Sequence, residues 1–177
     1  MKSNLMPVTE VPQHGSPVVP FENPQPAWPG LAVWLVTCFA APALGFASGP
    51  GEWYAQLQKP SWNPPGWVFG PVWTALYAMM GVAAWMIWRR GGFRVQRLPL
   101  ALFLAQLALN AAWTPLFFGL HQPGLAFLDI ALLWLAIIAT IAAFWRVQRT
   151  AAALLVPYLA WVSFATFLNF TIWRLNS

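Results

Sequence analysis

Five long apolar stretches constrain the fold of this chain more than any other feature. They cover about residues 30–48, 65–88, 98–119, 124–145 and 151–173. An apolar helix of about 20 residues crosses the hydrocarbon core of a bilayer. Only 7% of the residues are charged, against roughly 25% in a soluble domain, so a soluble fold of this length could not bury so much apolar surface. The sequence therefore predicts an all-α integral membrane protein, a five transmembrane helix bundle.

The chain divides into an extension, residues 1–27, and a membrane domain, residues 28–177. The extension contains six prolines and no helical periodicity, which predicts disorder. We expect no metal role for His14, which lies inside it. A cleavable signal peptide is the alternative interpretation of the first apolar stretch. That stretch is long for a signal peptide, and the segment before it is long and carries two glutamates.

The basic residues predict the orientation of the bundle. Five spans place the two termini on opposite sides of the membrane. The side of the N terminus then carries Lys2, Arg89, Arg90, Arg94, Arg97, Arg146 and Arg149, and the other side carries Lys59 and Arg174. Positive loops stay in the cytoplasm, so we expect a cytoplasmic N terminus in a bacterial inner membrane. The positive charges indicate topology and not nucleic-acid binding.

Prolines and aromatic residues mark the entry into the second span. Pro64 and Pro65 are expected in the first helical turn, where proline is tolerated, with Asn63 as the N-cap. Trp73 and Tyr77 follow at a spacing of i, i+4, on one face of the helix. Other tryptophans lie near predicted helix ends and are expected to anchor the protein at the membrane interface. These are Trp28, Trp62, Trp67, Trp85, Trp88, Trp145 and Trp173.

The third span has two contrasting faces. One face is a stripe of small residues, Ala101, Ala105, Ala108 and Ala112. Small residues allow close helix packing, either within the bundle or between two copies in a homodimer. The other face carries Gln106, Asn110, Trp113 and Phe117. Its two amides are costly in hydrocarbon unless they find hydrogen-bond partners.

Aromatic and amide groups from three spans reach the same half of the bilayer. Trp73 and Tyr77 come from the second span, Asn110 from the third, and Trp161 with Ala165 from the fifth, where Pro157 opens the backbone nearby. An aromatic-walled cavity with a few polar groups suits a flat, hydrophobic, conjugated ligand. The alternative is that these aromatic side chains only pack the core.

The other polar residues indicate no conventional enzyme. Asp129 lies inside a span, where an acid is functional or paired by default, and Lys59 and Arg174 are the candidate partners for an ion pair. His121 is expected to be solvated. The single cysteine, Cys38, excludes an intramolecular disulfide and a cysteine-based metal cluster. We expect no metal site and no catalytic set of side chains.

Several segments carry a resemblance to a known family. They are APALG (41–45), EWYAQLQKPSWNPPGWVFGPVWTALY (52–77), ALNAAWTPLFFG (108–119), LDIALLW (128–134) and PYLAWVSFATFLNF (157–170). In this order they resemble the TspO/MBR family of tryptophan-rich sensory proteins and translocator proteins, which are commonly dimeric five-helix bundles. The resemblance implies a pocket formed by Trp53, Trp73 and Trp161, with Tyr77, Asn110, Trp113 and Ala165 at further positions.

The resemblance also implies the ligands. Family members bind tetrapyrroles such as protoporphyrin IX and haem, as well as isoquinoline-carboxamide and benzodiazepine-type drugs, and they need no obligatory cofactor. Animal members bind cholesterol through a basic residue close after a tyrosine in the fifth span. Here the first basic residue after Tyr158 is Arg174, so weak or no sterol binding is expected. Phe164 is expected to narrow the pocket.

Three functions follow from this interpretation. The first is a tetrapyrrole sensor, carrier or scavenger, in which loop 49–64 acts as a lid. The second is an enzyme that degrades porphyrin in light through Trp73 and Trp161. The third is a structural or regulatory membrane partner whose cavity is filled by lipid.

Overall fold

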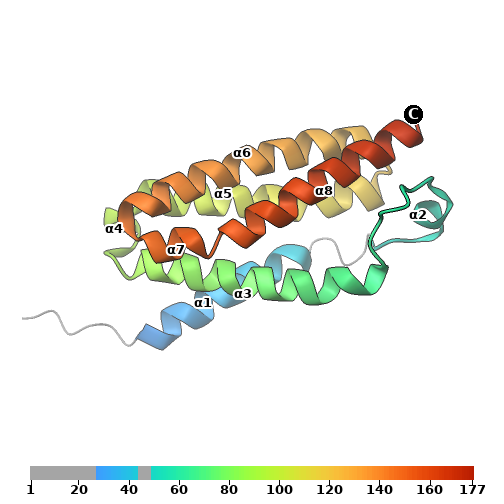
Figure 1. Cartoon of the computed structure of the whole chain (residues 1–177). Helices are drawn as coiled ribbons and strands as arrows, with labels where there is room; N and C mark the ends of the chain where they lie inside the picture. Colours follow the sequence, from blue (N-terminus) through green and yellow to red (C-terminus); the bar gives the residue numbers. More distant parts are fainter. Residues whose placement is uncertain (1–26, 44–48) are drawn as a thin grey trace, which may run out of the picture.

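A computed structural model describes residues 27–43 and 49–177, which fold into an elongated bundle of helices (Figure 1). This described part contains no β-strand. The elements are α1 (Ala27–Ala40), α2 (Glu52–Gln56), η2 (Gly66–Val68), α3 (Phe69–Trp88), α4 (Gly92–Val95), α5 (Arg97–Thr114), η3 (Pro115–Gly119), α6 (Pro123–Val147), α7 (Arg149–Ala153) and α8 (Val156–Leu175). Four helical segments are long and apolar enough to cross a membrane, and α1 belongs to a shorter apolar helix. The predicted five-helix membrane bundle is confirmed.

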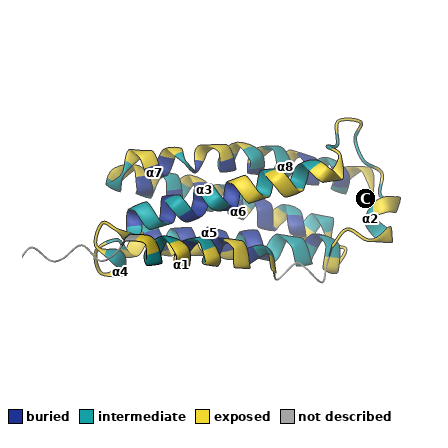
Figure 2. Cartoon of the chain, turned by 90° about the horizontal axis from the view of Figure 1, so that it is seen from below, coloured by how far each residue is buried: buried dark blue, intermediate teal, exposed yellow. Residues whose placement is uncertain are grey.

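The long helices lie side by side and bury one face each. Helix α1 packs on α3, α5 packs on α6, and α6 packs on α8. Buried residues line the inside of the bundle and exposed residues cover its outside (Figure 2). The core is almost entirely apolar, with Met80, Phe103, Ile137 and Phe144 fully buried. Lipid chains therefore meet a surface of exposed apolar side chains such as Val36, Leu132 and Phe167.

Two prolines interrupt the long helices where the sequence places them. Pro157 lacks the N–H that would bond to the carbonyl one turn earlier, and the fifth apolar segment accordingly divides into α7 and α8 with a turn between them. This predicted opening is confirmed. Pro115 has a similar effect that the sequence analysis missed. It begins the π-helical turn η3, in which the Leu120 N–H donates to the Pro115 carbonyl at 2.8 Å.

The predicted start of the second span is wrong in detail. The helical segment begins at Gly66, after Pro65, whose backbone is extended and provides no side-chain cap. The Asn63 side chain donates to the Pro64 carbonyl at 3.1 Å instead of capping the helix. A residue that precedes proline is forced out of the helical region, so the proline pair delays the helix. The proline inside the first turn of α3 is Pro71.

Some sequence predictions fall outside the described residues. They are the disorder of the extension, apart from its last residue, the role of His14, the position of Lys2 and the last part of the first apolar stretch, residues 44–48.

Candidate ligand-binding cavity

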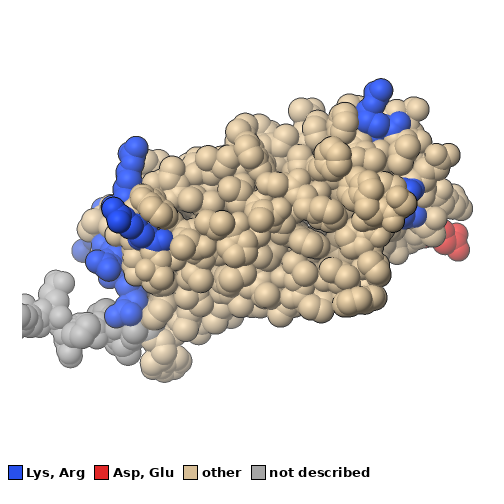
Figure 3. Space-filling view, viewed as in Figure 1, with Lys and Arg blue, Asp and Glu red and all other residues tan. Residues whose placement is uncertain are grey.

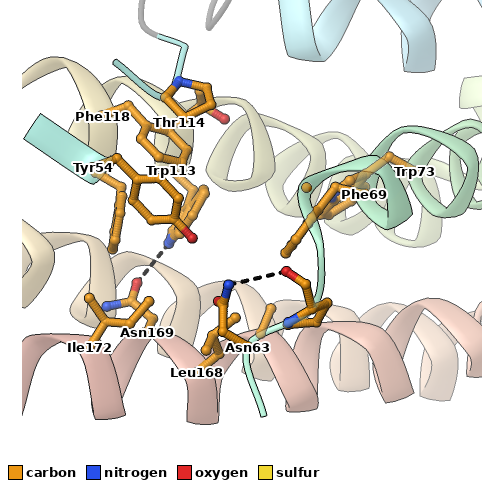
Figure 4. A pocket seen from close by; sticks show the side chains of 15 residues that line it. Tyr54, Asn63, Phe69, Trp73, Trp113, Thr114, Phe118, Leu168, Asn169 and Ile172 are labelled. Atoms are coloured by element: carbon orange, nitrogen blue, oxygen red, sulfur yellow. Dashed lines mark hydrogen bonds between the residues drawn. The ribbon is translucent and has the colours of Figure 1, made fainter. Parts of the chain in front are cut away.

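Two adjoining cavities lie between the loop before α3 and the ends of α3, α5 and α8. The first has a volume of about 290 Å³ and extends to Tyr54 and Asn63 in the loop (Figure 4). The second, of about 260 Å³, extends toward the bundle centre at Tyr77, Asn110 and Trp161. Both cavities are lined by Phe69, Trp73, Trp113, Thr114 and Ala165. These five side chains, the shared wall, line both cavities where they adjoin.

The aromatic wall is held in place by stacking and by a hydrogen-bonded tryptophan. The Trp73 ring stacks on the Tyr77 ring one helical turn later, with centroids 5.3 Å apart and planes at 25°. The Trp113 indole N–H donates to the Asn169 side-chain oxygen at 2.9 Å, and the Asn169 amide donates to the Pro123 carbonyl at 2.8 Å. These bonds tie the end of α5 to α8 and to the start of α6. The shared wall therefore has a fixed geometry.

A chain of polar side chains leads from the second cavity into the core. The Tyr77 hydroxyl donates to the Asn110 oxygen at 2.7 Å, and the Asn110 amide donates to the Tyr158 hydroxyl at 3.2 Å. Tyr158 in turn donates to the Gln106 oxygen at 2.9 Å. All four side chains are buried. The amides of the third span thus find partners inside the bundle, as the cost of burying them requires. The Gln106 nitrogen, however, has no partner among the described residues.

Trp161 brings an unpaired donor to the second cavity. Its indole N–H is buried and has no hydrogen-bond partner in the described part of the chain. The ring is held by Phe69 and Phe164, with centroid distances of 5.7 and 5.5 Å. An indole nitrogen is a donor only and usually finds a partner when it is buried. This N–H can therefore donate to an acceptor that none of the described residues supplies.

The structure brings together six of the seven residues predicted for the pocket. Trp73, Tyr77, Asn110, Trp113, Trp161 and Ala165 each line one or both cavities. Trp53 lines neither. Its ring packs against Phe117 at 5.7 Å and stacks on His121 at 4.3 Å. Contact of Trp53 with a ligand stays a prediction. His121 is exposed, as expected, but this ring stacking on Trp53 was not expected.

Several lining residues were missed by the sequence analysis, although some left a signal. Phe69 lies one helical turn before Trp73, on the same face. Asn169 is a polar residue in an apolar helix, two turns after Trp161. Tyr54 gives no such signal, because it lies in the loop and reaches the first cavity only through the tertiary fold. Burial raises the pKa of the Tyr54 hydroxyl above its usual value, and interaction with Asn63 opposes this shift.

The loop over the first cavity is fastened to the C-terminal end of α8. The Asn176 oxygen accepts from the Gln58 backbone N–H at 2.9 Å, and the Asn176 amide donates to the Gln58 carbonyl at 2.9 Å. The Trp62 ring stacks on Phe167 of α8, with centroids 5.4 Å apart. The loop therefore covers the cavity as an ordered segment that is attached at two places.

The expected ion pair of Asp129 with Lys59 or Arg174 is not present. Its Oδ2 is buried and has no partner among the described residues, whereas Lys59 donates to the Ala55 and Leu57 carbonyls at 3.3 and 3.1 Å. The charges do not meet because Lys59 turns back onto its own loop and Arg174 is exposed at the end of α8.

The alanine stripe of the third span lies on the outside of the bundle. Ala101, Ala105 and Ala108 are exposed, whereas Gln106 and Asn110 on the other face are buried. Ala112 is partly buried, so packing within the bundle is excluded for the first three alanines only. Contact between two copies of the chain stays a prediction. In the described residues, no three His, Cys, Asp or Glu side chains gather as a metal site would require.

Comparison with known proteins agrees with this architecture. A sequence profile described as the TspO/MBR family matches residues 30–174. The human translocator protein is 50% identical over 145 residues, which cover 77% of this chain and 86% of the relative. The tryptophan-rich protein TspO of Chlorobaculum tepidum is 46% identical, covering 82% of this chain and 95% of its own length. The tryptophan-rich sensory protein of Cereibacter sphaeroides is 42% identical, and the match covers 84% of this chain and 92% of the relative. This multi-pass integral membrane protein therefore belongs to the TspO/MBR family of membrane sensory and translocator proteins.

Proposed function

We propose that the protein binds a tetrapyrrole of the protoporphyrin IX type and acts as a sensor, carrier or scavenger in porphyrin homeostasis and stress response. The observation that carries this proposal is the Trp161 N–H, which lies in an aromatic cavity and has no hydrogen-bond partner among the described residues. A buried donor without a partner costs roughly 1–3 kcal/mol. A ligand that supplies an acceptor there removes this cost, and the rings around it select a flat conjugated molecule.

The size of the cavities supports a large ligand that occupies both of them. Each cavity, at about 290 and 260 Å³, is slightly smaller than the range of roughly 300–1,000 Å³ typical of ligand pockets. A macrocycle therefore needs both volumes, with Trp73 and Trp113 of the shared wall stacked on its faces. Isoquinoline-carboxamide and benzodiazepine-type drugs would occupy the same space and compete with the porphyrin.

The polar groups of the second cavity determine which hydrogen-bonding groups the edge of the ligand must carry. The Tyr77 proton is committed to Asn110, so the Tyr77 oxygen can only accept a further hydrogen bond. Trp161 can only donate. A ligand that carries carboxylates at its edge, as a free-base porphyrin does, satisfies the Trp161 position. Among the described residues the lining includes no His, Cys or Met, which are common axial ligands of haem iron. Tyr54 and Tyr77 are its only side chains of a type that can ligate the iron.

A fluorescence titration of the purified protein with protoporphyrin IX tests the proposal. We expect saturable quenching of tryptophan fluorescence, with affinity weakened about tenfold in Trp161→Phe, since the lost hydrogen bond is worth about 1.4 kcal/mol. Trp73→Phe should also weaken binding. Trp145→Phe is the matched control, because Trp145 is exposed near the opposite end of the bundle. Linear quenching that is identical in all variants would support the lipid-filled structural alternative.

One observation favours light-dependent porphyrin oxidation as a second candidate function. The stacked rings of Trp73 and Tyr77 are both oxidisable, and both line the second cavity. A photoexcited porphyrin would transfer energy or an electron to dioxygen, which would act as the oxidant. Illumination in air should then yield a new absorbing product with the natural protein, and markedly less with Trp161→Phe. Equal rates in both proteins would leave only photochemistry in solution.

We further propose a bacterial inner membrane as the location, with the N terminus in the cytoplasm. Six arginines lie at the end of the bundle where α3 ends and α7 begins, whereas Lys59 and Arg174 lie at the other end (Figure 3). This asymmetry supports the orientation through the positive-inside rule. A C-terminal alkaline phosphatase fusion should be active and a C-terminal green fluorescent protein fusion dark. The opposite result would reverse the orientation.

A further inference from the structure

A third cavity lies at the opposite end of the bundle from the ligand cavities. It is a groove of about 430 Å³ that runs between α1, the end of α3, α4 and α5. Its lining includes Val33, Trp34, Trp88, Phe93 and Leu104. No part of the proposed tetrapyrrole site reaches it, because the two sites lie at opposite ends of α3. Phe69, in the first turn, lines the ligand cavities, and Trp88, in the last turn, lines the groove. The groove therefore requires its own explanation.

The walls of the groove are ordered by close aromatic packing. The Trp34 ring stacks on Phe93, with centroids 6.1 Å apart and planes at 27°, and meets the edge of Phe103 at 5.7 Å. Gly30 permits the approach of Trp88, since a Cβ at Gly30 would lie only 2.5 Å from the Trp88 ring. Helix α1 and the end of α3 are thus locked together, and the groove is a fixed feature of the fold.

The groove opens toward the lipid chains. Val33, Phe93 and Leu104 remain 63%, 47% and 37% exposed along it. Its single polar side chain, Thr37, directs its hydroxyl to the Val33 carbonyl of its own helix at 2.8 Å. The groove therefore presents mainly hydrocarbon and ring surface, which suits an acyl chain, and its lining also includes the indole rings of Trp34 and Trp88.

Arginines follow two of the residues that line the groove, at the arginine-rich end of the bundle. Arg89 and Arg90 directly follow Trp88, and Arg94 directly follows Phe93. Arg89 lies over the Trp85 ring at 4.9 Å, and the Arg90 carbonyl accepts a hydrogen bond from the Gln96 side chain at 3.1 Å. The backbone of this loop is therefore ordered.

No carboxylate neutralises these arginines in the described part of the chain. Its two acidic side chains, Glu52 and Asp129, lie in the loop after α1 and in the second turn of α6, both toward the opposite end of the bundle. The basic end is visible as a cluster of blue atoms in Figure 3. Positive charge that no described carboxylate neutralises, beside an apolar groove that opens to lipid, complements a molecule with an acyl chain and an anionic head.

We propose that this groove binds an anionic phospholipid from the leaflet that meets the arginine-rich end. One acyl chain lies against Trp34 and Phe93, and the phosphate is held by Arg90 and Arg94. Arginine suits phosphate because its guanidinium forms paired hydrogen bonds with two oxygens. The site goes beyond the tetrapyrrole site and does not depend on it.

Native mass spectrometry of the full chain, with dioleoyl phosphatidylglycerol and dioleoyl phosphatidylcholine, tests this site. We expect at least one phosphatidylglycerol to be retained in preference to phosphatidylcholine. Arg90→Gln with Arg94→Gln should weaken this preference roughly tenfold or more, the effect of removing two arginines near a membrane surface. Val33→Trp should reduce retention by filling the groove, and its exposed position should tolerate the larger ring.

The matched control removes the same charge from the same end of the bundle. Arg146→Gln with Arg149→Gln lies on the α6–α7 connection, whose residues do not line the groove. We expect this variant to keep its preference for phosphatidylglycerol. Equal losses in the two double variants would mean general attraction to a positive surface and would overturn the site. Equal retention of the two lipids by the natural protein, or unchanged retention by Val33→Trp, would overturn it as well.

Discussion

At the scale of single residues, one buried amide holds the interior together. Asn110 joins Tyr77 of α3 to Tyr158 of α8, because it accepts from one hydroxyl and donates to the other. Every bond in the chain from Tyr77 to Gln106 runs in the same direction, so each bond polarises the next. The amide therefore fixes the relative positions of three helices around the second cavity.

Replacing this amide should cost more than removing either hydroxyl. Asn110→Ala removes the acceptor of the Tyr77 hydroxyl and one donor to the Tyr158 hydroxyl, which still donates to Gln106. It also opens a small cavity, so we expect a loss of roughly 2–4 kcal/mol in unfolding free energy. Tyr77→Phe removes one hydrogen bond and should cost about 1 kcal/mol, within the range measured for hydrogen bonds between membrane helices. Thermal or denaturant unfolding of the detergent-solubilised protein measures both changes.

The control for this prediction is Thr74→Ala. Thr74 is exposed on α3 and donates only to the Gly70 carbonyl of its own helix, at 2.9 Å. Its loss should leave stability nearly unchanged. If Asn110→Ala proved no worse than Thr74→Ala, the amide would not link the helices energetically.

At the scale of elements, Gly81 sets the distance between α1 and α3. A Cβ at this position would lie 2.8 Å from the Leu35 side chain and 3.1 Å from the Leu35 Cα. The backbone of α1 cannot move away without opening the core around Met80 and Cys38, which are fully buried. We expect Gly81→Ala to destabilise the protein by about 1–3 kcal/mol through overpacking, as measured by thermal unfolding.

Gly70 provides the matched substitution on the same helix. Nothing lies within 4 Å of a Cβ built there, and alanine is a better helix former than glycine by roughly 0.5–1 kcal/mol. Gly70 also precedes Pro71, where a Cβ disfavours the helical backbone. These two effects oppose each other, so Gly70→Ala should change stability less than Gly81→Ala does. A similar loss of stability in both variants would show that the close approach of α1 is not the reason why position 81 requires glycine.

The loop over the first cavity depends on one residue near the C terminus. Asn176→Ala removes both hydrogen bonds to Gln58, so that apolar and ring contacts, such as those of Trp62 and Leu57, then hold the loop. We expect hydrogen exchange in residues 52–63 to increase several-fold, while exchange in α3 and α5 stays the same. Ser177→Ala is the control, because Ser177 bonds only to Trp173 of its own helix. Unchanged exchange in the Asn176 variant would mean that the loop is held without this pair.

Local signals in the sequence predict most elements, and tertiary contacts decide the remaining details. Apolar length and Pro157 predict the helices and the break in the last one, because both act within a few residues. The π-helical turn at Pro115 and the late start after Pro65 depend on how freed backbone groups find new partners. Trp53 and Tyr54 are neighbours, yet Tyr54 lines the cavity and Trp53 turns to His121. Only the fold distinguishes such neighbours, and Asp129 lacks its expected ion pair for the same reason.

At the scale of the whole molecule, the two ends of the bundle have different chemistry. One end holds the aromatic cavities and is covered by the fastened loop. The other end is positively charged and lies beside an apolar groove. The alanine stripe of α5 runs along the outside between the two ends and provides a surface on which a second copy could approach closely. We therefore propose a homodimer through Ala101, Ala105, Ala108 and Ala112.

Substitution in the middle of this stripe should separate the two copies without unfolding either. Ala108 is exposed, so leucine there meets lipid in a monomer at little cost, whereas in a dimer it prevents the backbone approach that small residues allow. We expect Ala108→Leu to shift the protein from dimer to monomer in light-scattering measurements at equal detergent concentration. Ala75→Leu, an equal change at an exposed position of α3, should leave the dimer intact. A dimer that survives Ala108→Leu would place the contact on another face, and a protein that is monomeric before any substitution would remove the proposal altogether.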